Sequence, residues 1–136
     1  LINFSINHVP NTIIDTKGLS FAIKKAIHLG IKNLKIKPKI SEILLDGGLK
    51  APIEFKQKTI VKGDEKERII AWASILAKVS RDKLMVKMAK KYPKYGLEVH
   101  KGYGTASHRQ AIQKYGVSRV HRLSFCKSID FSEPLV

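Results

Sequence analysis

Apolar residues recur at helical spacing in two segments of the chain. This spacing predicts helices over residues 11–29 and 65–91, and the capping residues around 106–115 predict a third. Gly30 is the expected stop of the first helix, and Pro93 lies just beyond the second. Thr105 is the expected N-cap of the third helix and Gly116 its C-terminal stop, because these residue types satisfy the free backbone groups at helix ends.

Short apolar runs between the first two helices predict two strands. The first, EILL at residues 42–45, runs out at Asp46, and the second, TIVK at residues 59–62, runs out at Gly63 and Asp64. The segment between them, which contains Pro52, is expected to be irregular. Strands that alternate with helices indicate an α/β layer structure.

Two further segments lack a clear period. Residues 97–104 are rich in glycine and predict a loop, and residues 117–136 predict a surface tail that packs locally. No internal repeat or low-complexity linker divides the sequence. A chain of 136 residues is then long enough for one domain with its own core and too short for two ordinary ones.

Charge narrows the class of partner. The sequence has 26 Lys and Arg against 11 Asp and Glu, a net charge of +15. Between residues 83 and 127 eleven side chains are basic and one, Glu98, is acidic. A field of this sign attracts polyanions, with nucleic acid ahead of an anionic membrane. The alternative is a lysine-rich surface that serves only solubility.

Cysteine use and hydropathy favour a cytoplasmic protein. Cys126 is the single cysteine and has no internal partner for a disulfide, as is usual in a reduced compartment. The longest apolar run, residues 69–77, is too short to cross a bilayer, and the N-terminus lacks the regions of a signal peptide. We therefore expect no association with a membrane. Leu1 in place of Met is typical of a fragment or a processed product.

Two aspartates are candidates for metal chemistry. Asp46 and Asp64 each follow an apolar run, and carboxylates at neighbouring strand ends can converge on one divalent cation such as Mg²⁺ or Mn²⁺. Two-metal phosphodiester chemistry requires several carboxylates, so a pair supplies only part of a site. Each aspartate also has a structural interpretation, in which Asp46 accepts from nearby turn amides and Asp64 caps the long helix with Glu67.

The segment HKGYGT at residues 100–105 suits a sugar-phosphate backbone. Lys101 supplies charge, and Gly102 permits close approach and an exposed N–H group. Tyr103 can lay its ring against a sugar or base. The alternative is a structural turn around a packed tyrosine. The five histidines have no metal-ligand spacing, which argues against a zinc site.

Five motifs follow one another in an order that resembles one family. They are LLDGG, TIVKGD, AWASILAKVSRD, YPKYGLEVHKGYGTASH and HRLSF. From about residue 41 to 126 they resemble the C-terminal part of bacterial ribonuclease HII, the type 2 ribonuclease H. The resemblance implies an α/β, RNase H-like fold with C-terminal helices. It also implies a metal-dependent endonuclease, usually monomeric, that uses Mn²⁺ or Mg²⁺.

The implied substrates are RNA in RNA–DNA hybrids and ribonucleotides embedded in duplex DNA, which places the family in DNA replication and repair. Asp46 matches the metal-binding aspartate of the family's Asp-Gly motif, and Asp64 matches its last catalytic carboxylate. Tyr103 matches the tyrosine that senses the ribonucleotide–DNA junction, and Lys101 and Gly102 lie beside it. The resemblance places the long helix on the sheet, with two candidate substrate contacts, Ser74 and Lys78.

The chain departs from the family's pattern at its start. No Asp-Glu pair precedes Asp46, and Gly-Arg-Gly does not occur, although the family carries both on its opening strands. The resemblance therefore implies a truncated fold that lacks those strands, with a partial domain over residues 1–127 and a tail over 128–136. Gly48 replaces a usual Asn, and Trp72 replaces a usual small residue, so its ring needs extra room or solvent exposure.

Three hypotheses follow. The first is an endonuclease whose catalytic set is completed by a preceding segment, because two carboxylates alone should hold Mg²⁺ poorly. The second is a non-catalytic basic fragment that binds duplex nucleic acid, with an affinity that falls steeply with salt. The third is a fragment without a stable fold, which a cooperative melt would exclude.

Overall fold

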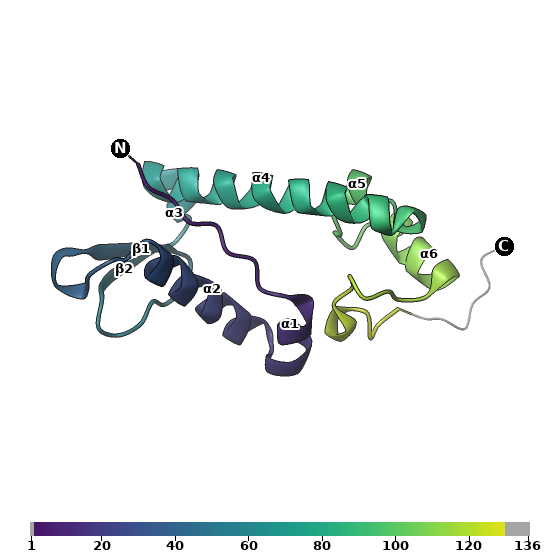
Figure 1. Cartoon of the computed structure of the whole chain (residues 1–136), viewed down its shortest axis with the longest axis horizontal. Coiled ribbons are helices and arrows are strands. Elements are labelled where there is room, and N and C mark those ends of the chain that lie inside the picture. The colour runs from purple at the N-terminus through teal and green to yellow at the C-terminus, as the bar shows by residue number, and fades with distance from the viewer. Residues whose placement is uncertain (1, 130–136) are drawn as a thin grey trace. The chain divides into compact units, whose positions relative to one another are not determined.

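The computed structural model describes residues 2–129, and the chain divides after Lys78 into two compact units. The first unit contains the helices α1 to α3, a two-stranded sheet and the start of a long helix, and the second contains the rest of that helix and the helical turns that follow it (Figure 1). The division falls inside the long helix α4, Arg68–Lys91. The units are described separately below.

The first unit begins with two helices where the sequence predicts one. α1 covers Asn11–Lys17 and α2 covers Leu19–Asn33. Gly18 separates them with φ 83°, a left-handed conformation that a residue without Cβ adopts freely. The predicted stop at Gly30 is wrong, because α2 continues to Asn33, whose side-chain amide donates to Asn7 Oδ1 at 2.8 Å.

The sheet consists of two parallel strands. β1 covers Glu42–Asp46 and follows a 3₁₀ turn at Pro38–Ile40, and β2 covers Lys56–Ile60. The register pairs Glu42 with Lys56 at one end and Asp46 with Ile60 at the other. β1 agrees with the prediction apart from its terminal residue. β2 does not, because the predicted strand at 59–62 begins three residues and ends two residues too far along the chain.

Gln57 explains why the second strand starts early. Its side-chain oxygen accepts from the Ala51 N–H at 2.8 Å, and its side-chain nitrogen donates to the Ala51 carbonyl at 3.2 Å. These bonds fold the connection between the strands back onto β2. A polar residue therefore occupies a strand position that hydrophobic patterning does not detect.

The predicted helix over residues 65–91 is also two helices. The short α3 covers Gly63–Lys66, and Glu67 is extended, with φ −124° and ψ 115°, before α4 begins. Trp72 on α4 is 50% exposed, so the solvent exposure expected for this large ring is confirmed. Ile70 is buried, whereas Ile75 is 59% exposed. The expected packing of the long helix on the sheet does not extend to residues 72–78, whose side chains are exposed.

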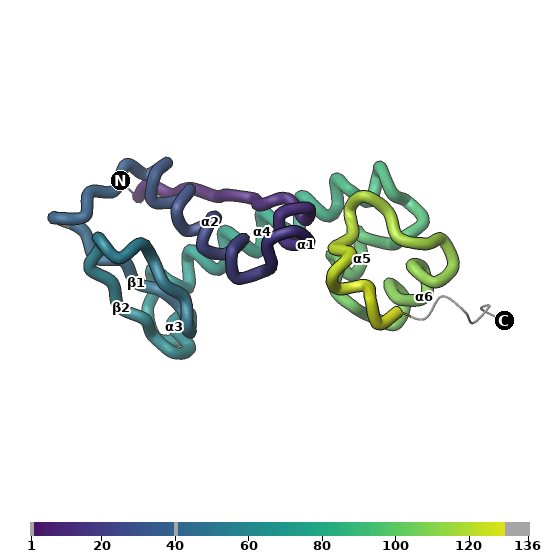
Figure 2. The backbone as a smooth tube through the Cα atoms, turned by 90° about the horizontal axis from the view of Figure 1, so that it is seen from below, coloured from purple at the N-terminus to yellow at the C-terminus, as the bar shows by residue number. Residues whose placement is uncertain are grey.

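The second unit holds the better-formed core. It contains the 3₁₀ turn Pro93–Tyr95, α5 at Leu97–His100, α6 at Ala106–Tyr115 and the 3₁₀ turn Leu123–Phe125. The tube in Figure 2 shows the segment after α6 returning beside α5 and α6. The buried cluster comprises Met85, Ala89, Tyr95, Leu97, Ile112 and Cys126.

The ends of α6 agree with the sequence prediction. Thr105 Oγ1 accepts from the His108 N–H at 3.3 Å, and Gly116 follows the helix with φ 74°. The predicted loop over residues 97–104 is partly wrong, because Leu97–His100 forms one helical turn. Gly96 makes this turn possible with φ 64°, which redirects the chain after Tyr95.

The segment after Gly116 is not the surface tail that its lack of period predicts. Cys126 is in the core, Val120 and Ile129 pack against the core, and the Tyr95 hydroxyl donates to the Gly116 carbonyl at 2.9 Å. The buried residues of this segment are isolated positions in irregular backbone, so the sequence shows no helical or strand periodicity that would predict them. Of the predicted tail at 128–136, residues 130–136 lie outside the described part, and the division after residue 127 stays a prediction.

These elements confirm a mixed α/β fold with a small parallel sheet and C-terminal helices. Over residues 2–129, no helix has both the length and the apolar character needed to cross a bilayer.

Candidate functional site

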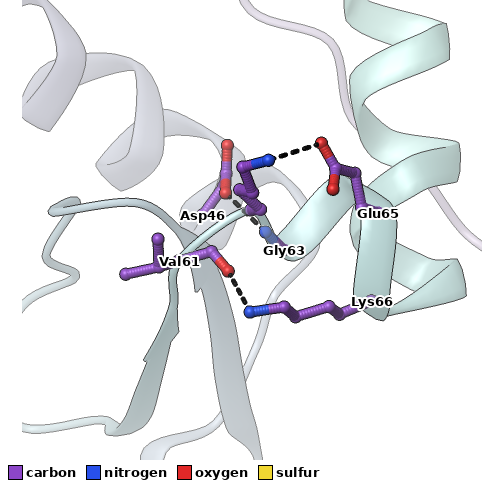
Figure 3. Close-up of polar contacts among 6 residues, drawn as sticks. Asp46, Val61, Gly63, Glu65 and Lys66 are labelled. Carbon is purple, nitrogen blue, oxygen red and sulfur yellow. Dashed lines mark hydrogen bonds and ion pairs between the residues drawn. The ribbon is translucent and has the colours of Figure 1, made fainter.

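The first unit brings the Asp46 side chain to the start of α3. The Gly63 N–H donates to Asp46 Oδ1 at 2.7 Å, across seventeen residues of sequence (Figure 3). Gly63 is bonded directly to Asp64, so the two candidate aspartates are joined through one hydrogen bond and one peptide link. The bond brings the Asp46 side chain to the backbone of the residue before Asp64, and the shared role predicted for the two carboxylates stays a prediction. Asp64 lies on α3 and not at a strand end, because β2 stops at Ile60.

The fit around Gly63 leaves no space for a side chain. A Cβ there would lie 2.8 Å from Ile70 Cδ1 and 3.3 Å from Asp46 Oδ1. Both distances are shorter than ordinary van der Waals contact. Gly63 therefore lets the backbone reach the carboxylate. Asp46 accepts from a backbone amide, as its structural interpretation expects, but the amide belongs to Gly63, seventeen residues away, and not to the turn that follows Asp46.

Two lysines hold the segment that leads into α3. Lys62 adopts a left-handed conformation with φ 55°, and its ammonium lies 3.5 Å from the Glu65 carboxylate. The Lys66 ammonium donates to the Val61 carbonyl at 2.9 Å (Figure 3). Glu65 is therefore engaged in an ion pair next to Asp64.

The donor set at this site is the right chemistry for a hard cation but is incomplete. Asp46 and Asp64 offer carboxylate oxygens, which Mg²⁺ and Mn²⁺ prefer. No group of three or more His, Cys, Asp or Glu placed to hold a metal ion occurs among residues 2–129. Two carboxylates, one of them already accepting from Gly63, do not by themselves fit a two-metal site.

The two predicted substrate contacts on the long helix lie in the first unit. Ser74 and Lys78 are exposed on α4, one helical turn apart. Both side chains are accessible to a ligand, and their role in binding stays a prediction.

The predicted loop contacts lie in the second unit. Lys101 ends α5 with φ 50°, and its ammonium donates to the Glu98 carbonyl. Gly102 follows with φ 79°, and a Cβ there would lie 2.9 Å from Met85 Cε. Tyr103 is 60% exposed, so its ring is presented to solvent and the alternative of a packed tyrosine is wrong.

Sequence reasoning missed three histidines beneath this loop. His100, His108 and His121 are each at least nine-tenths buried. The rings of His100 and His108 stack with centroids 4.1 Å apart, and Nε2 of His108 lies 3.2 Å from Nε2 of His121. The one sequence signal for the cluster was that His100 and His108 flank the glycines of the loop. His121 had no signal, because irregular backbone brings it to the cluster.

Burial disfavours the charged form of two of these histidines, His108 and His121. Loss of hydration lowers the pKa of His108, against the opposing effect of its hydrogen bond to the Tyr103 carbonyl. Burial, and then the neighbouring His108, lower the pKa of His121. Both imidazoles are therefore neutral at pH 7, within a chain of net charge +15.

Comparison with known proteins agrees with the motif order. The family model described as Ribonuclease HII matches residues 1–128. The chain is 46% identical over 128 residues to ribonuclease HII of Caldicellulosiruptor bescii, covering 94% of this chain and 61% of that protein. It is 46% identical over 127 residues to ribonuclease HII of Acetivibrio thermocellus, covering 93% of this chain and 49% of that protein.

The chain belongs to the ribonuclease HII family. A third relative, ribonuclease HII of Endomicrobium trichonymphae, is 45% identical over 125 residues, which is 91% of this chain and 59% of that protein. The chain thus spans about half to three fifths of the length of the ribonuclease HII proteins that it matches. The small parallel sheet with its helices is consistent with a truncated RNase H-like fold.

Two departures from the family's motifs are accommodated in this ribonuclease HII chain. Trp72 is half exposed on α4 and so needs no space in a core. Gly48 lies in the turn after β1, and a Cβ there would meet no atom within 4 Å. A side chain at position 48 would therefore fit the described structure.

Proposed function

We propose that this chain is part of a type 2 ribonuclease H that cleaves RNA in RNA–DNA hybrids and at ribonucleotides embedded in duplex DNA. The observation that carries the proposal is the bond between the Asp46 carboxylate and the Gly63 N–H. This bond links the Asp46 side chain to the residue before Asp64, and Asp46 and Asp64 are the two residues that match the family's catalytic carboxylates.

Asp46 and Asp64 would bind Mn²⁺ or Mg²⁺, together with carboxylates from outside this chain's described residues. A divalent cation at such a site acts as a Lewis acid on phosphate. The contribution of this chain is positional. The Gly63 N–H holds one oxygen of Asp46, and the ion pair of Lys62 with Glu65 steadies the turn that carries Asp64.

The second unit would bind the nucleic acid. Lys101 and Gly102 lie beside the sugar-phosphate backbone in this proposal, and the exposed ring of Tyr103 lies against the sugar at the ribonucleotide. Gly102 has a positive φ, its N–H donates to His100 Nδ1, and a Cβ in its place would overlap Met85 Cε, so its proposed role is to shape the turn that carries Lys101 and Tyr103. Ser74 and Lys78 would add contacts along the duplex from their exposed positions on α4.

A cleavage assay tests the catalytic proposal. The whole chain is incubated with Mn²⁺ or Mg²⁺ and an end-labelled DNA duplex that carries one ribonucleotide. Cleavage at the ribonucleotide that is lost in both Asp46→Asn and Asp64→Asn supports the proposal. Cleavage that persists in both variants, or that is equal on an all-DNA duplex, would contradict it.

The second candidate function is binding without cleavage. It is favoured by the net charge of +15 and by a donor set of two carboxylates among the described residues. Duplex affinity should then fall steeply as salt rises, and Asp46→Asn should leave affinity unchanged or raise it. Salt-sensitive binding with no cleavage in either metal would favour this function for the chain by itself.

A further inference from the structure

The buried histidines beneath the loop form a chain of hydrogen bonds with backbone groups at its ends. The Ser118 N–H donates to His121 Nδ1 at 2.9 Å. Nε2 of His121 and Nε2 of His108 are 3.2 Å apart. Nδ1 of His108 lies 2.9 Å from the Tyr103 carbonyl.

The backbone ends of this chain fix where each proton lies. A carbonyl only accepts, so His108 carries its proton on Nδ1 and donates to Tyr103. Nδ1 of His121 lies 2.9 Å from the Ser118 N–H and 3.3 Å from the Ser118 carbonyl; the nearer group donates, so Nδ1 is an acceptor and the proton of His121 lies on Nε2. His121 Nε2–H then donates to the bare Nε2 of His108, which gives one consistent direction along the whole chain.

His100 holds the other side of the same loop. Its Nε2 lies 2.6 Å from the Tyr95 carbonyl, so it donates there and leaves Nδ1 as an acceptor. The Gly102 N–H donates to that Nδ1 at 3.2 Å. A buried imidazole therefore binds the backbone before Tyr103, at the Gly102 N–H, and another binds the carbonyl of Tyr103 itself.

These contacts exclude a metal site. Each ring nitrogen of His100, His108 and His121 already has a partner, and the His100 and His108 rings are stacked face to face. The cluster therefore has no lone pair directed at a common point. What it controls is the backbone that carries the exposed Tyr103 ring.

We infer that His108 is a positioning residue for Tyr103, and that its Nδ1–H bond to the Tyr103 carbonyl sets the chain's preference for a ribonucleotide over DNA. This inference rests on the proposed role of Tyr103 as the residue against the ribonucleotide sugar. His121 acts one step further away, because its Nε2–H donates to the bare Nε2 of His108. Neither imidazole touches substrate, since both are buried.

The first test reads the tautomers directly in the whole chain. Long-range ¹H–¹⁵N correlation of the imidazoles at about pH 7.5 should show the proton on Nδ1 in His108 and on Nε2 in His100 and His121. A proton on Nε2 of His108 would overturn the inference. This measurement needs no activity and no substitution.

The second test compares two variants that each keep one of the two bonds of His108. In His108→Asn the side-chain NH₂ occupies the place of Nδ1 and can still donate to Tyr103. In His108→Gln the amide reaches the place of Nε2, and the bond to Tyr103 is lost. The two variants have the same charge at neutral pH, and His28→Gln, at an exposed position on α2, controls for loss of a histidine elsewhere.

The readout is the ratio of affinities for a duplex with one ribonucleotide and the matching all-DNA duplex. We expect His108→Gln to reduce this ratio about tenfold, and His108→Asn and His28→Gln to keep it, because one lost hydrogen bond is worth about that factor. Affinity for the all-DNA duplex should not change in any variant. Equal ratios in the Asn and Gln variants would overturn the inference.

Hydrogen exchange of backbone amides tests the positioning role of His108 independently of the proposed function. In His108→Gln, exchange of the Tyr103 and Thr105 amides should rise about tenfold, and in His108→Asn it should not. If the wild-type chain shows no preference for a ribonucleotide, the role proposed for Tyr103 fails, and the exchange result alone decides whether His108 positions the loop. Equal exchange in the two variants would show that it does not.

Discussion

The Asp46 carboxylate accepts a hydrogen bond of 2.7 Å from the backbone N–H of Gly63, the residue that precedes Asp64. The bond joins the end of β1 to the start of α3, which lie seventeen residues apart. The Asp46 side chain therefore accepts a structural hydrogen bond in addition to its proposed role in metal binding. Substitution can separate the two roles, because Asn keeps an acceptor oxygen without the negative charge and Ala removes both.

Asp46→Asn should leave stability within about 0.5 kcal/mol, whereas Asp46→Ala should lower it by about 1–2 kcal/mol, because the part-buried Gly63 N–H loses its partner. Thermal and urea unfolding measure both. Cleavage should be absent in both variants if Asp46 is catalytic. A stable Asp46→Ala variant would show that the bond contributes nothing to folding.

Gly63→Ala should destabilise the chain by about 1–3 kcal/mol, because the new methyl group overlaps Ile70 Cδ1 and crowds Asp46 Oδ1. Ile70→Val removes the overlapping methyl group, so the double variant should be more stable than the sum of the two single changes predicts. Urea unfolding of the wild type, the two single variants and the double variant gives the coupling free energy between positions 63 and 70. Gly48→Ala, where a Cβ meets nothing within 4 Å, is the matched control.

Gln57→Leu should lower stability by about 1–3 kcal/mol, because the part-buried Ala51 N–H and carbonyl both lose their partner. Lys58→Leu, at an exposed position on the same strand, should change stability much less. Urea unfolding compares the two. Equal effects would mean that the connection between the strands does not depend on Gln57.

Stability should fall as the pH drops below 6.5. Burial lowers the pKa of His108 and His121 below 6.5 in the folded chain, so the unfolded chain takes up protons first. Well above pH 6.5 these groups are neutral in both states and contribute no pH dependence. As the pH is lowered from 6.5 toward the pKa that His108 and His121 have in the folded chain, the melting temperature should fall.

Melting curves between about pH 5 and pH 8 test this slope. His108→Asn has one titrating group fewer, and its melting temperature should depend less on pH than that of the wild type. The carboxylates are the same in both chains, so their titration cancels in the comparison. Identical slopes would mean that His108 does not resist protonation.

Much of the fold could be predicted because local chemistry determines it. Thr105 caps α6 through a hydrogen bond within one turn, and Gly116 ends the helix with a positive φ. The end of β1 at Asp46 was also predicted, from an apolar run that stops at an aspartate. These signals lie within a few residues of the structure that they specify.

The rest depended on contacts across longer distances. The position of β2 follows from the bonds of Gln57 to the Ala51 backbone, which no hydrophobic period records. The histidine cluster joins residues on α5 and α6 to His121 in irregular backbone. Polar groups that meet in this way have no periodic spacing, and only the folded chain brings them together.

The parallel strands are joined through residues 47–55, a shorter connection than the dozen or more residues, usually helical, that parallel strands ordinarily need. The whole arrangement of Asp46, Gly63 and Asp64 is therefore contained in the continuous stretch from residue 42 to 66. Closing a short loop has a small entropic cost, and contacts that are near in sequence form early in folding. On the ribosome, where the N-terminal part emerges first, this pair of aspartates can assemble before the loop that carries Tyr103 has been synthesised.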